Sequence, residues 1–313
     1  MRALPSLRQL GYLAEVADRL NFRAAAAASF VTQSTLSAGI KELESLLGVE
    51  LVERDPRGVR LTPAGEEVAR RARNVLAAAQ DLVDSARGAG APLGGVFRLG
   101  VIPTIAPFLL SGVMSKIRDE YPELKLYLRE DLTERLLEKL RAGELDATLI
   151  ALPFETAELT VIELFRDEFW FVARQDDSHA RKKEMLVRDL DPGSVVLLEE
   201  GHCLRDHAIA ACGAHGAKTK ALLEATSLTT LIQMVEGGLG VTLLPELALK
   251  AGILRGTRLI ARPFSTQIPA RTVALVARPA GARRVGVEML AAFFQRHYRE
   301  QSKVRAASRR KTR

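Results

Sequence analysis

Apolar residues in the first sixty positions recur at helical spacing in short segments separated by capping and turn residues. A first helix is predicted over residues 7–17, and Asn21 is a suitable N-cap for a second helix over 22–29. After a tight turn at 30–32, a third helix is predicted over 33–47, and Gly48 would end it. The residues expected to face inward from this third helix are Leu36, Ile40, Leu43 and Leu47.

A hairpin and a long helix follow. Two short β-stretches over 50–54 and 59–61 flank the turn sequence Asp55-Pro56-Arg57-Gly58, and Thr62 caps the next helix. Apolar residues in that helix recur with 4-3-4-3-4 spacing, which is a heptad seam: Val68, Ala72, Val75, Ala79, Leu82 and Ala86. The seam could pack on the chain's own body. An arginine-rich helix that joins two domains favours pairing with a second copy instead.

Strands and helices alternate from residue 96 onward, after a small-residue linker over 88–95. Strands are predicted over 96–101, 124–129, 145–151, 168–174, 194–198, 240–244 and 272–277. Helices are predicted to end near 121 and to span 132–142, 226–236 and 283–299. This alternation predicts an α/β domain with a mostly parallel sheet covered by helices.

Composition and charge narrow the functional classes. The chain has 313 residues, enough for two domains, and a net charge of +7. Six of these positive charges lie in the last twelve residues, which hold no acid, so net charge alone is poor evidence for nucleic-acid binding. We expect this tail, 302–313, to be solvated and disordered. No apolar run is long enough to span a bilayer and no signal peptide is evident, so we expect a cytoplasmic protein without membrane contact.

Two short helices joined by a tight turn and followed by a two-stranded wing predict a winged helix-turn-helix, whose second helix of the pair enters the major groove of DNA. Short polar side chains and one lysine lie where that helix would meet base edges and phosphates: Thr32, Gln33, Ser34, Thr35, Ser37 and Lys41. The wing offers Arg54, Arg57 and Arg60 for phosphate or minor-groove contact. Each residue could equally be a helix cap or a turn residue, but together they fall on one surface of the motif.

Residues 1–66 resemble the N-terminus of LysR-type transcriptional regulators. The resemblance lies in Leu7-Arg8-Gln9-Leu10, Asn21-Phe22-Arg23-Ala24-Ala25-Ala26, Thr32-Gln33-Ser34-Thr35-Leu36-Ser37 and Leu61-Thr62-Pro63-Ala64-Gly65-Glu66. Many members carry Pro where this chain has Ser34. The segment 236–245 is similar to part of the family's effector domain. The resemblance implies a winged DNA-binding domain over 1–62, a dimerising linker helix over 63–90, and a periplasmic-binding-protein-like effector domain of two α/β subdomains over 91–301.

The only two cysteines, Cys203 and Cys212, lie close together in the chain. In a cytosolic protein such a pair is usually catalytic, redox-sensing or metal-binding rather than a structural disulfide. Cys203 has charged neighbours and Cys212 lies among alanines, so we predict that Cys203 is the attacking residue and Cys212 the resolving one. Because the intervening segment looks helical, joining the two sulfurs would require it to unwind, which would make the bond a conformational switch.

Gly201-His202-Cys203-Leu204-Arg205-Asp206 is similar to the peroxidatic-cysteine motif of the peroxide-sensing members of the family. Ile102-Pro103-Thr104 and Ala225-Thr226-Ser227-Leu228 resemble their pocket segments. This resemblance implies that Thr104 and Thr133 position hydrogen peroxide and that His202 orders the pocket. Arg205 and Asp206 would give polar support, and Arg271 would favour the thiolate.

The same resemblance implies particular partners: double-stranded promoter DNA, RNA polymerase, a cellular thiol reductant, and further copies of the chain in homodimers or homotetramers. Antioxidant genes would be activated through a disulfide between Cys203 and Cys212. No cofactor is expected, because neither a phosphate-binding loop nor a dinucleotide fingerprint is present.

Three other interpretations stay open. Cys203, His207, Cys212 and His215 have N and S donors that suit zinc. The chain could be a LysR-type regulator that senses a small metabolite in the effector-domain cleft, with both cysteines incidental. It could also be a thiol peroxidase, although an intact DNA-binding head argues against turnover as its output, and a serine hydrolase is not supported because no G-x-S-x-G elbow is present.

Overall fold

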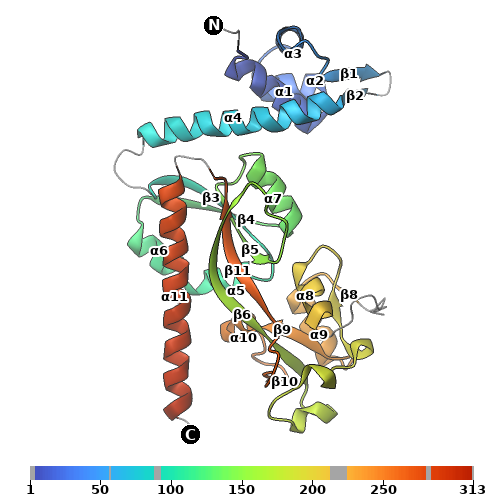
Figure 1. Ribbon diagram of the computed structural model, residues 1–313, viewed down its shortest axis with the longest axis vertical. Helices are drawn as coiled ribbons and strands as arrows, with labels where there is room; N and C mark the ends of the chain where they lie inside the picture. The colour runs from blue at the N-terminus through green and yellow to red at the C-terminus, as the bar shows by residue number, and fades with distance from the viewer. Residues whose placement is uncertain (1–3, 56–57, 88–92, 212–223, 280–282, 312–313) are drawn as a thin grey trace. The chain divides into compact units, whose positions relative to one another are not determined.

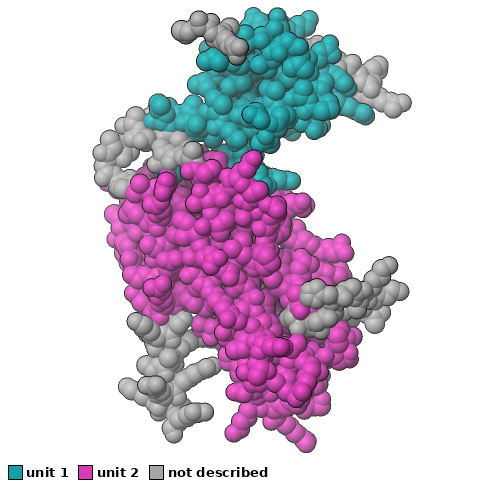
Figure 2. Space-filling model, in the orientation of Figure 1, with its two compact units in different colours: residues 1–90, 138–145, 280–283 teal, residues 91–137, 146–279, 284–313 magenta. Residues whose placement is uncertain are grey.

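The structure is a computed structural model that describes residues 4–55, 58–87, 93–211, 224–279 and 283–311 (Figure 1). The chain divides into two compact units (Figure 2). The first comprises residues 1–90 together with 138–145 and 280–283, and the second comprises the remainder. Each unit is described separately.

The first unit contains the predicted helices and hairpin in the predicted order. Its elements are α1 (Leu7–Arg19), α2 (Phe22–Ala28), α3 (Gln33–Leu47), β1 (Val52–Asp55), β2 (Gly58–Leu61) and α4 (Pro63–Arg87). The predicted caps are confirmed: the Asn21 side chain accepts hydrogen bonds from the backbone N–H groups of Arg23 and Ala24, and Thr62 Oγ1 accepts from Gly65 N at 2.9 Å. These bonds satisfy N–H groups that have no partner inside the helix.

A close approach of α1 and α3 holds the first unit together. A Cβ atom on Gly39 would lie 2.7 Å from Cδ2 of Tyr12, so only glycine lets the Tyr12 ring lie against α3. Leu36, Ile40 and Leu43 are buried as predicted, whereas Leu47 is 40% exposed and does not face the core. Leu47 is the last residue of α3, so no neighbouring helix covers it.

The heptad seam of α4 divides between two environments. Ala72 and the partly buried Val68 pack into the core of the first unit, so this end of the seam covers the chain's own body. Val75 and Leu82, further along the helix, are 47% and 69% exposed. Only the second half of the seam therefore offers an apolar stripe to a partner.

The second unit alternates strands and helices. Its first elements are β3 (Gly95–Val101), α5 (Ala106–Leu109), η1 (Leu110–Gly112), α6 (Met114–Glu120), β4 (Leu124–Glu130), α7 (Thr133–Arg141), β5 (Ala147–Leu152) and β6 (Thr160–Arg174), although α7 from residue 138 onward belongs to the first unit. Then come η2 (Ser178–Arg181), η3 (Val187–Asp189), η4 (Pro192–Ser194), β7 (Leu197–Leu198), α8 (Cys203–Ala211), β8 (Glu224–Ala225) and α9 (Leu228–Glu236). The last are β9 (Thr242–Pro245), α10 (Glu246–Ala251), β10 (Leu259–Arg262), β11 (Ala270–Ala277) and α11 (Arg284–Lys311).

The main sheet is mixed rather than mostly parallel, which corrects the sequence prediction. Its order is β10-β6-β11-β5-β3-β4, with β9 also paired to β6. The pairs β3–β4 and β3–β5 are parallel, whereas β11 runs antiparallel to both β5 and β6, and β9 and β10 run antiparallel to β6. The alternation of strands and helices along the chain does not show strand direction. Here β6 carries the chain toward a second core and β11 carries it back.

That second core lies around α8, α9, β7 and β9, at the far end of β6 (Figure 1). Phe169 and Phe171 of β6 are buried in it together with Leu204 of α8 and Leu231 of α9. The small parallel pair β7–β8 lies beside these helices. The long strand β6 thus supports both ends of the unit, and the cysteine helix α8 belongs to the far end.

The final helix is longer than expected. α11 runs to Lys311 and includes most of the segment predicted as a disordered tail. Alanine, lysine and arginine favour helix formation, and cations at a helix C-terminus interact favourably with its dipole, which accounts for the extension. Among the described residues, no helix combines the length and apolar character needed to cross a membrane.

Candidate functional site

The first turn of α3 presents the predicted DNA-facing residues. Thr32 is the N-cap, and its Oγ1 lies 2.9 Å from Ser34 Oγ and 2.8 Å from Thr35 Oγ1. Thr32, Gln33, Ser34, Thr35 and Lys41 are exposed, and Ser37 is partly buried. The structure therefore brings these six residues onto one helix, five of them open to solvent.

The wing is fixed to α3 through one carboxylate. Glu44 Oε1 accepts hydrogen bonds from Leu51 N at 2.9 Å and from Val52 N at 3.1 Å, where β1 begins. Arg60 lies on β2 and is exposed. The side chain of Arg54 and the whole of Arg57 lie outside the described residues.

The second candidate site surrounds Cys203, the first residue of α8. Gly201 precedes it with a φ of 93°, a backbone conformation that favours glycine, and turns the chain into the helix. Cys203 and His202 are both buried. A thiol at a helix N-terminus lies near the positive end of the helix dipole, and this positive end stabilises the thiolate.

A buried ion pair lies behind the thiol. Arg271 of β11 donates from Nε to Asp167 Oδ2 at 3.0 Å, and neither side chain is exposed to solvent. Arg271 also donates to the Thr104 hydroxyl at 2.7 Å and to the Thr104 carbonyl at 3.0 Å. Asp167 Oδ1 accepts from Leu247 N at 2.9 Å. The guanidinium is thus held in one position by β6 and by the loop that follows β3.

Two threonines complete the pocket, with different roles. The Thr104 hydroxyl accepts a hydrogen bond from Arg271. The Thr133 hydroxyl, at the start of α7, is buried and makes no well-formed hydrogen bond among the described residues, but it interacts with the Cys203 sulfur and lowers the pKa of that thiol. A buried hydroxyl without a well-formed hydrogen bond is unfavourable for stability, so Thr133 is the group most available to a small polar ligand.

Burial decides the pKa of the Cys203 thiol. Burial raises this pKa above its ordinary value, and the opposing effects of Arg271 and Thr133 are smaller. Asp167 accounts for the modest effect of Arg271, because an arginine paired with a carboxylate acts on the sulfur as a dipole rather than as a full charge. The thiol therefore lies in a buried pocket. Its polar neighbours favour the thiolate, but their effect is smaller than the cost of desolvating that charge.

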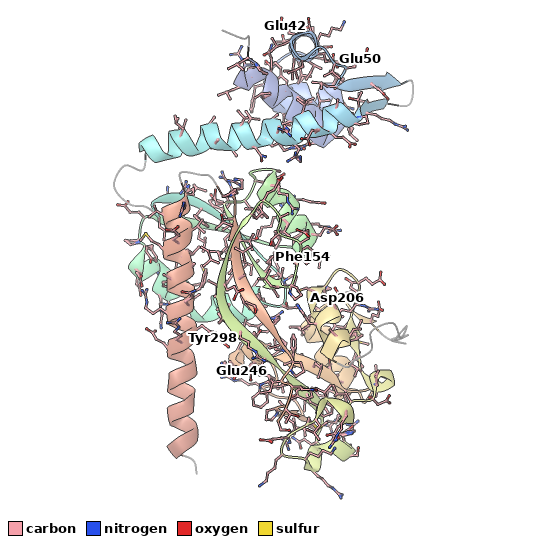
Figure 3. The ribbon with its side chains drawn as sticks, in the orientation of Figure 1. Glu42, Glu50, Phe154, Asp206, Glu246 and Tyr298 are labelled. Atoms are coloured by element: carbon pink, nitrogen blue, oxygen red, sulfur yellow. The ribbon has the colours of Figure 1, made fainter. Side chains whose placement is uncertain are left out.

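The other predicted pocket residues are placed differently. Burial lowers the pKa of His202, which favours the neutral form of its ring. Arg205 donates to the Leu198 carbonyl at 3.0 Å and to Glu224 Oε1 at 2.6 Å, which ties α8 to β7 and β8. Asp206, labelled on α8 in Figure 3, is exposed. Cys212 lies outside the described residues.

Sequence reasoning missed Asp167 and considered His207 only as a candidate zinc ligand. Asp167 stands in the strand β6 and carried no signal, because its partner is more than a hundred positions away. His207 lies one helical turn after Cys203, and its Nε2 donates to the Leu152 carbonyl at 3.1 Å, while its Nδ1 is buried without a partner among the described residues. Burial, with a smaller effect of Arg271, lowers the pKa of His207. The spacing to Cys203 was the signal that could have linked His207 to the pocket.

The metal interpretation gains no support from this geometry. No group of three metal-ligating side chains occurs among the residues that the structure describes. Cys212 and His215, two of the four ligands considered, lie outside them.

Comparisons with known families and proteins extend this picture. Residues 7–66 match the bacterial regulatory helix-turn-helix protein family, lysR type, and residues 90–299 match the LysR substrate binding domain. The chain is 47% identical over 278 residues to the HTH-type transcriptional regulator EstR of Acinetobacter baylyi, covering 89% of this chain and 92% of that protein.

A second curated relative and a solved structure are also similar over nearly the whole chain. The chain is 42% identical over 300 residues to a probable hydrogen peroxide-inducible genes activator of Streptomyces viridosporus, covering 96% of each. It is 36% identical to a full-length OxyR variant from Pseudomonas aeruginosa, whose structure superposes with a TM-score of 0.78 and covers 94% of this chain and 95% of that one.

The two family matches together span most of the chain and agree with the winged head and the mixed α/β unit. Members of this family bind DNA and regulate transcription rather than catalysing a reaction. This chain belongs to the LysR family of bacterial transcriptional regulators.

Proposed function

We propose that this regulator senses hydrogen peroxide through Cys203 and converts the signal into a disulfide with Cys212. The observation that carries the proposal is the pocket itself: a buried thiol at the start of α8, which interacts with the buried Thr133 hydroxyl and with Arg271, itself anchored to Thr104. The name of the Streptomyces relative, a probable hydrogen peroxide-inducible genes activator, supports the choice of peroxide as the signal.

The chemistry proceeds in two balanced steps. The Cys203 thiolate attacks one peroxide oxygen, the O–O bond breaks, hydroxide leaves, and the sulfur becomes a sulfenic acid. The Cys212 thiol then attacks that sulfur, an S–S bond forms, and water leaves. Thr133 donates a hydrogen bond to peroxide or to the thiolate, and Arg271 keeps Thr104 in position within the pocket. A cellular thiol reductant resets the switch by thiol–disulfide exchange.

The helix α8 opposes the second step, and this opposition makes the disulfide a switch. Eight residue steps separate Cys203 from Ala211, which corresponds to about 12 Å along a helix. One further step of about 3.8 Å cannot bring the next Cα within the roughly 6.8 Å limit for a disulfide. Disulfide formation therefore unwinds α8, and unwinding releases the hydrogen bonds that Arg205 and His207 make to β7, β8 and the end of β5.

The output is a change in DNA binding. The exposed half of the α4 seam, including Val75 and Leu82, pairs two chains through their linker helices, and effector domains join such dimers into tetramers. Rearrangement of α8 alters how effector domains pair. This changes operator contacts and activates antioxidant genes through RNA polymerase.

The test is the fate of the two thiols after one equivalent of hydrogen peroxide. Intact mass, thiol titration and peptide mapping should show rapid loss of both thiols and a Cys203–Cys212 linked peptide. Cys212→Ser should stop at a sulfenic acid on Cys203 that a dimedone probe captures. Cys203→Ser should not respond, yet should fold and bind DNA. Peroxide-dependent promoter switching in Cys203→Ser would refute the mechanism.

The competing function is detection of a small metabolite by the same family fold. The relative with 47% identity, EstR, has a name that does not mention peroxide. If both thiols stay free at one equivalent of peroxide, this alternative replaces the peroxide proposal, and the search for a ligand moves to the effector domain.

A further inference from the structure

Phe30, in the turn between α2 and α3, is the most exposed large apolar residue that the structure describes. Its side chain is 96% exposed, and its backbone φ is 55°. Both features are unfavourable in isolation, because a bulky residue in the left-handed region is strained and an exposed aromatic ring leaves a large apolar surface in water.

The backbone explains why the left-handed residue stands at this position. Val31 N donates to the Ala26 carbonyl at 3.0 Å, and Phe30 N donates to the Ala27 carbonyl at 3.2 Å. This pair of bonds is the Schellman motif, in which the residue at the place of Phe30 adopts positive φ and is usually glycine. The motif thus needs the conformation, but nothing in it needs a phenyl ring.

The surroundings of Phe30 indicate what the ring contacts. It lies two residues before Thr32, the N-cap of α3, and the adjacent Gln33 and Ser34 are exposed on the surface that a helix-turn-helix turns toward the major groove. No charged residue occurs between Arg23 and Lys41, so the turn and the start of α3 contribute no cation of their own for phosphate. The Ser34 and Thr35 hydroxyls are hydrogen-bonded to Thr32.

We infer that Phe30 is a specificity-determining DNA contact, whose ring packs against the 5-methyl group of a thymine at the edge of the major groove. Thymine is the base that presents an apolar group there, and a phenyl ring is a suitable partner for it. Contact with DNA removes the exposed ring from water, so binding recovers the free energy that exposure costs the free protein. This inference rests on DNA binding by the LysR-type head and is independent of peroxide sensing.

The test combines a protein variant with a base variant. Full-length wild-type protein selects a duplex from a randomised library, and each thymine of that duplex is replaced in turn by deoxyuridine, which lacks only the methyl group. At one thymine per half-site, wild-type affinity should fall about fivefold, the scale of a lost base contact. Phe30→Gly should bind the selected duplex about five- to tenfold more weakly and should not distinguish thymine from uracil at that position.

Controls separate base reading from folding and from phosphate contact. Phe30→Gly relieves the backbone strain, so its melting temperature should rise, and Phe30→Asn, which also tolerates positive φ, should repeat the loss of affinity. The salt dependence of binding should not change, because no phosphate contact is lost. Leu20 is a matched control, since it also has a positive φ, 47°, and is half exposed: Leu20→Gly should keep affinity and thymine preference.

Three results would overturn the inference. The first is wild-type affinity and thymine preference in both Phe30 variants. The second is an equal loss of affinity on every sequence, and the third is a loss accompanied by a shallower salt dependence. Either of the last two would place Phe30 at the DNA backbone or in the fold. A loss of peroxide response would leave all these measurements unchanged.

Discussion

The two candidate sites of this regulator are built in opposite ways. The DNA-facing surface comes from one short stretch of chain, the turn before α3 and its first turns, and its side chains are mostly exposed. The thiol pocket is buried and takes Thr104, Thr133, Asp167, Cys203 and Arg271 from five separate places in the chain. Substitutions on the exposed surface should therefore change binding with little effect on stability, whereas substitutions in the pocket should change both.

The largest expected effect is the loss of the carboxylate that balances Arg271. Asp167→Ala leaves a buried guanidinium unpaired, so the free energy of unfolding should fall by about 3–5 kcal/mol. Urea unfolding measures this free energy. The matched change is Glu67→Gln in α4, where Glu67 forms exposed ion pairs with Arg70 and Arg71, and the melting temperature should not move. If the two variants destabilised the protein equally, the buried ion pair would contribute no more to stability than the exposed one.

The reaction of the pocket with peroxide should depend steeply on pH. The Cys203 pKa is raised above its ordinary value of 9.0, and only the thiolate reacts, so the second-order rate constant should increase about tenfold per pH unit between pH 6 and 8. Stopped-flow measurement of thiol loss tests this. A rate constant that is flat over this range would show a thiolate already formed at neutral pH and would contradict the dominance of burial.

The packing of the DNA-binding head should be sensitive at one glycine. In Gly39→Ala the new Cβ would meet the Tyr12 ring at 2.7 Å, so the head should lose about 1–3 kcal/mol of unfolding free energy. Gly11→Ala in α1 is the control, because its Cβ meets nothing within 4 Å and should stabilise the helix by about 0.5–1 kcal/mol. Thermal unfolding compares the two. Destabilisation by both variants would indicate that the loss of stability comes from the backbone conformation and not from the Tyr12 contact.

The two pocket threonines should separate chemistry from stability. Thr133→Val removes a buried hydroxyl that makes no well-formed hydrogen bond and interacts with the Cys203 sulfur, so the rate constant with peroxide should fall about tenfold while stability is kept or rises slightly. Thr104→Val removes a partner of Arg271 and should lower stability as well. Measurements of the peroxide rate constant and of the melting temperature for each variant distinguish the two threonines. If both variants lost stability equally, Thr133 would have a structural partner after all.

The smallest expected effect is acid sensitivity from His207. Its pKa is lowered in the fold, so the neutral ring is favoured there, and the stabilisation is complete above about pH 6.5 and declines below it as the unfolded state takes up a proton. His207→Gln cannot titrate and should lose less melting temperature between pH 7 and pH 5. His202 shifts in the same direction, so part of the acid sensitivity should remain. An unchanged pH profile would exclude His207 as a source.

The sequence by itself determined the head. The helices predicted at 7–17, 22–29 and 33–47, which the structure places at 7–19, 22–28 and 33–47, the caps Asn21 and Thr62 and the glycine at 48 follow from contacts between residues a few positions apart, which periodicity and capping rules describe. The sequence also singled out Cys203, and the family resemblance added the candidates Thr104, Thr133, His202 and Arg271; all five are buried in the structure.

Only the tertiary structure decided how these residues act on one another. Strand direction in the sheet, the pairing of Arg271 with Asp167, and the hydrogen bond from His207 to Leu152 depend on segments far apart in the chain, and spacing carries no information about them. Burial likewise decides which of these side chains carry a charge. The raised Cys203 pKa and the lowered His202 pKa follow from desolvation, which exists only once distant segments have excluded water from around these side chains.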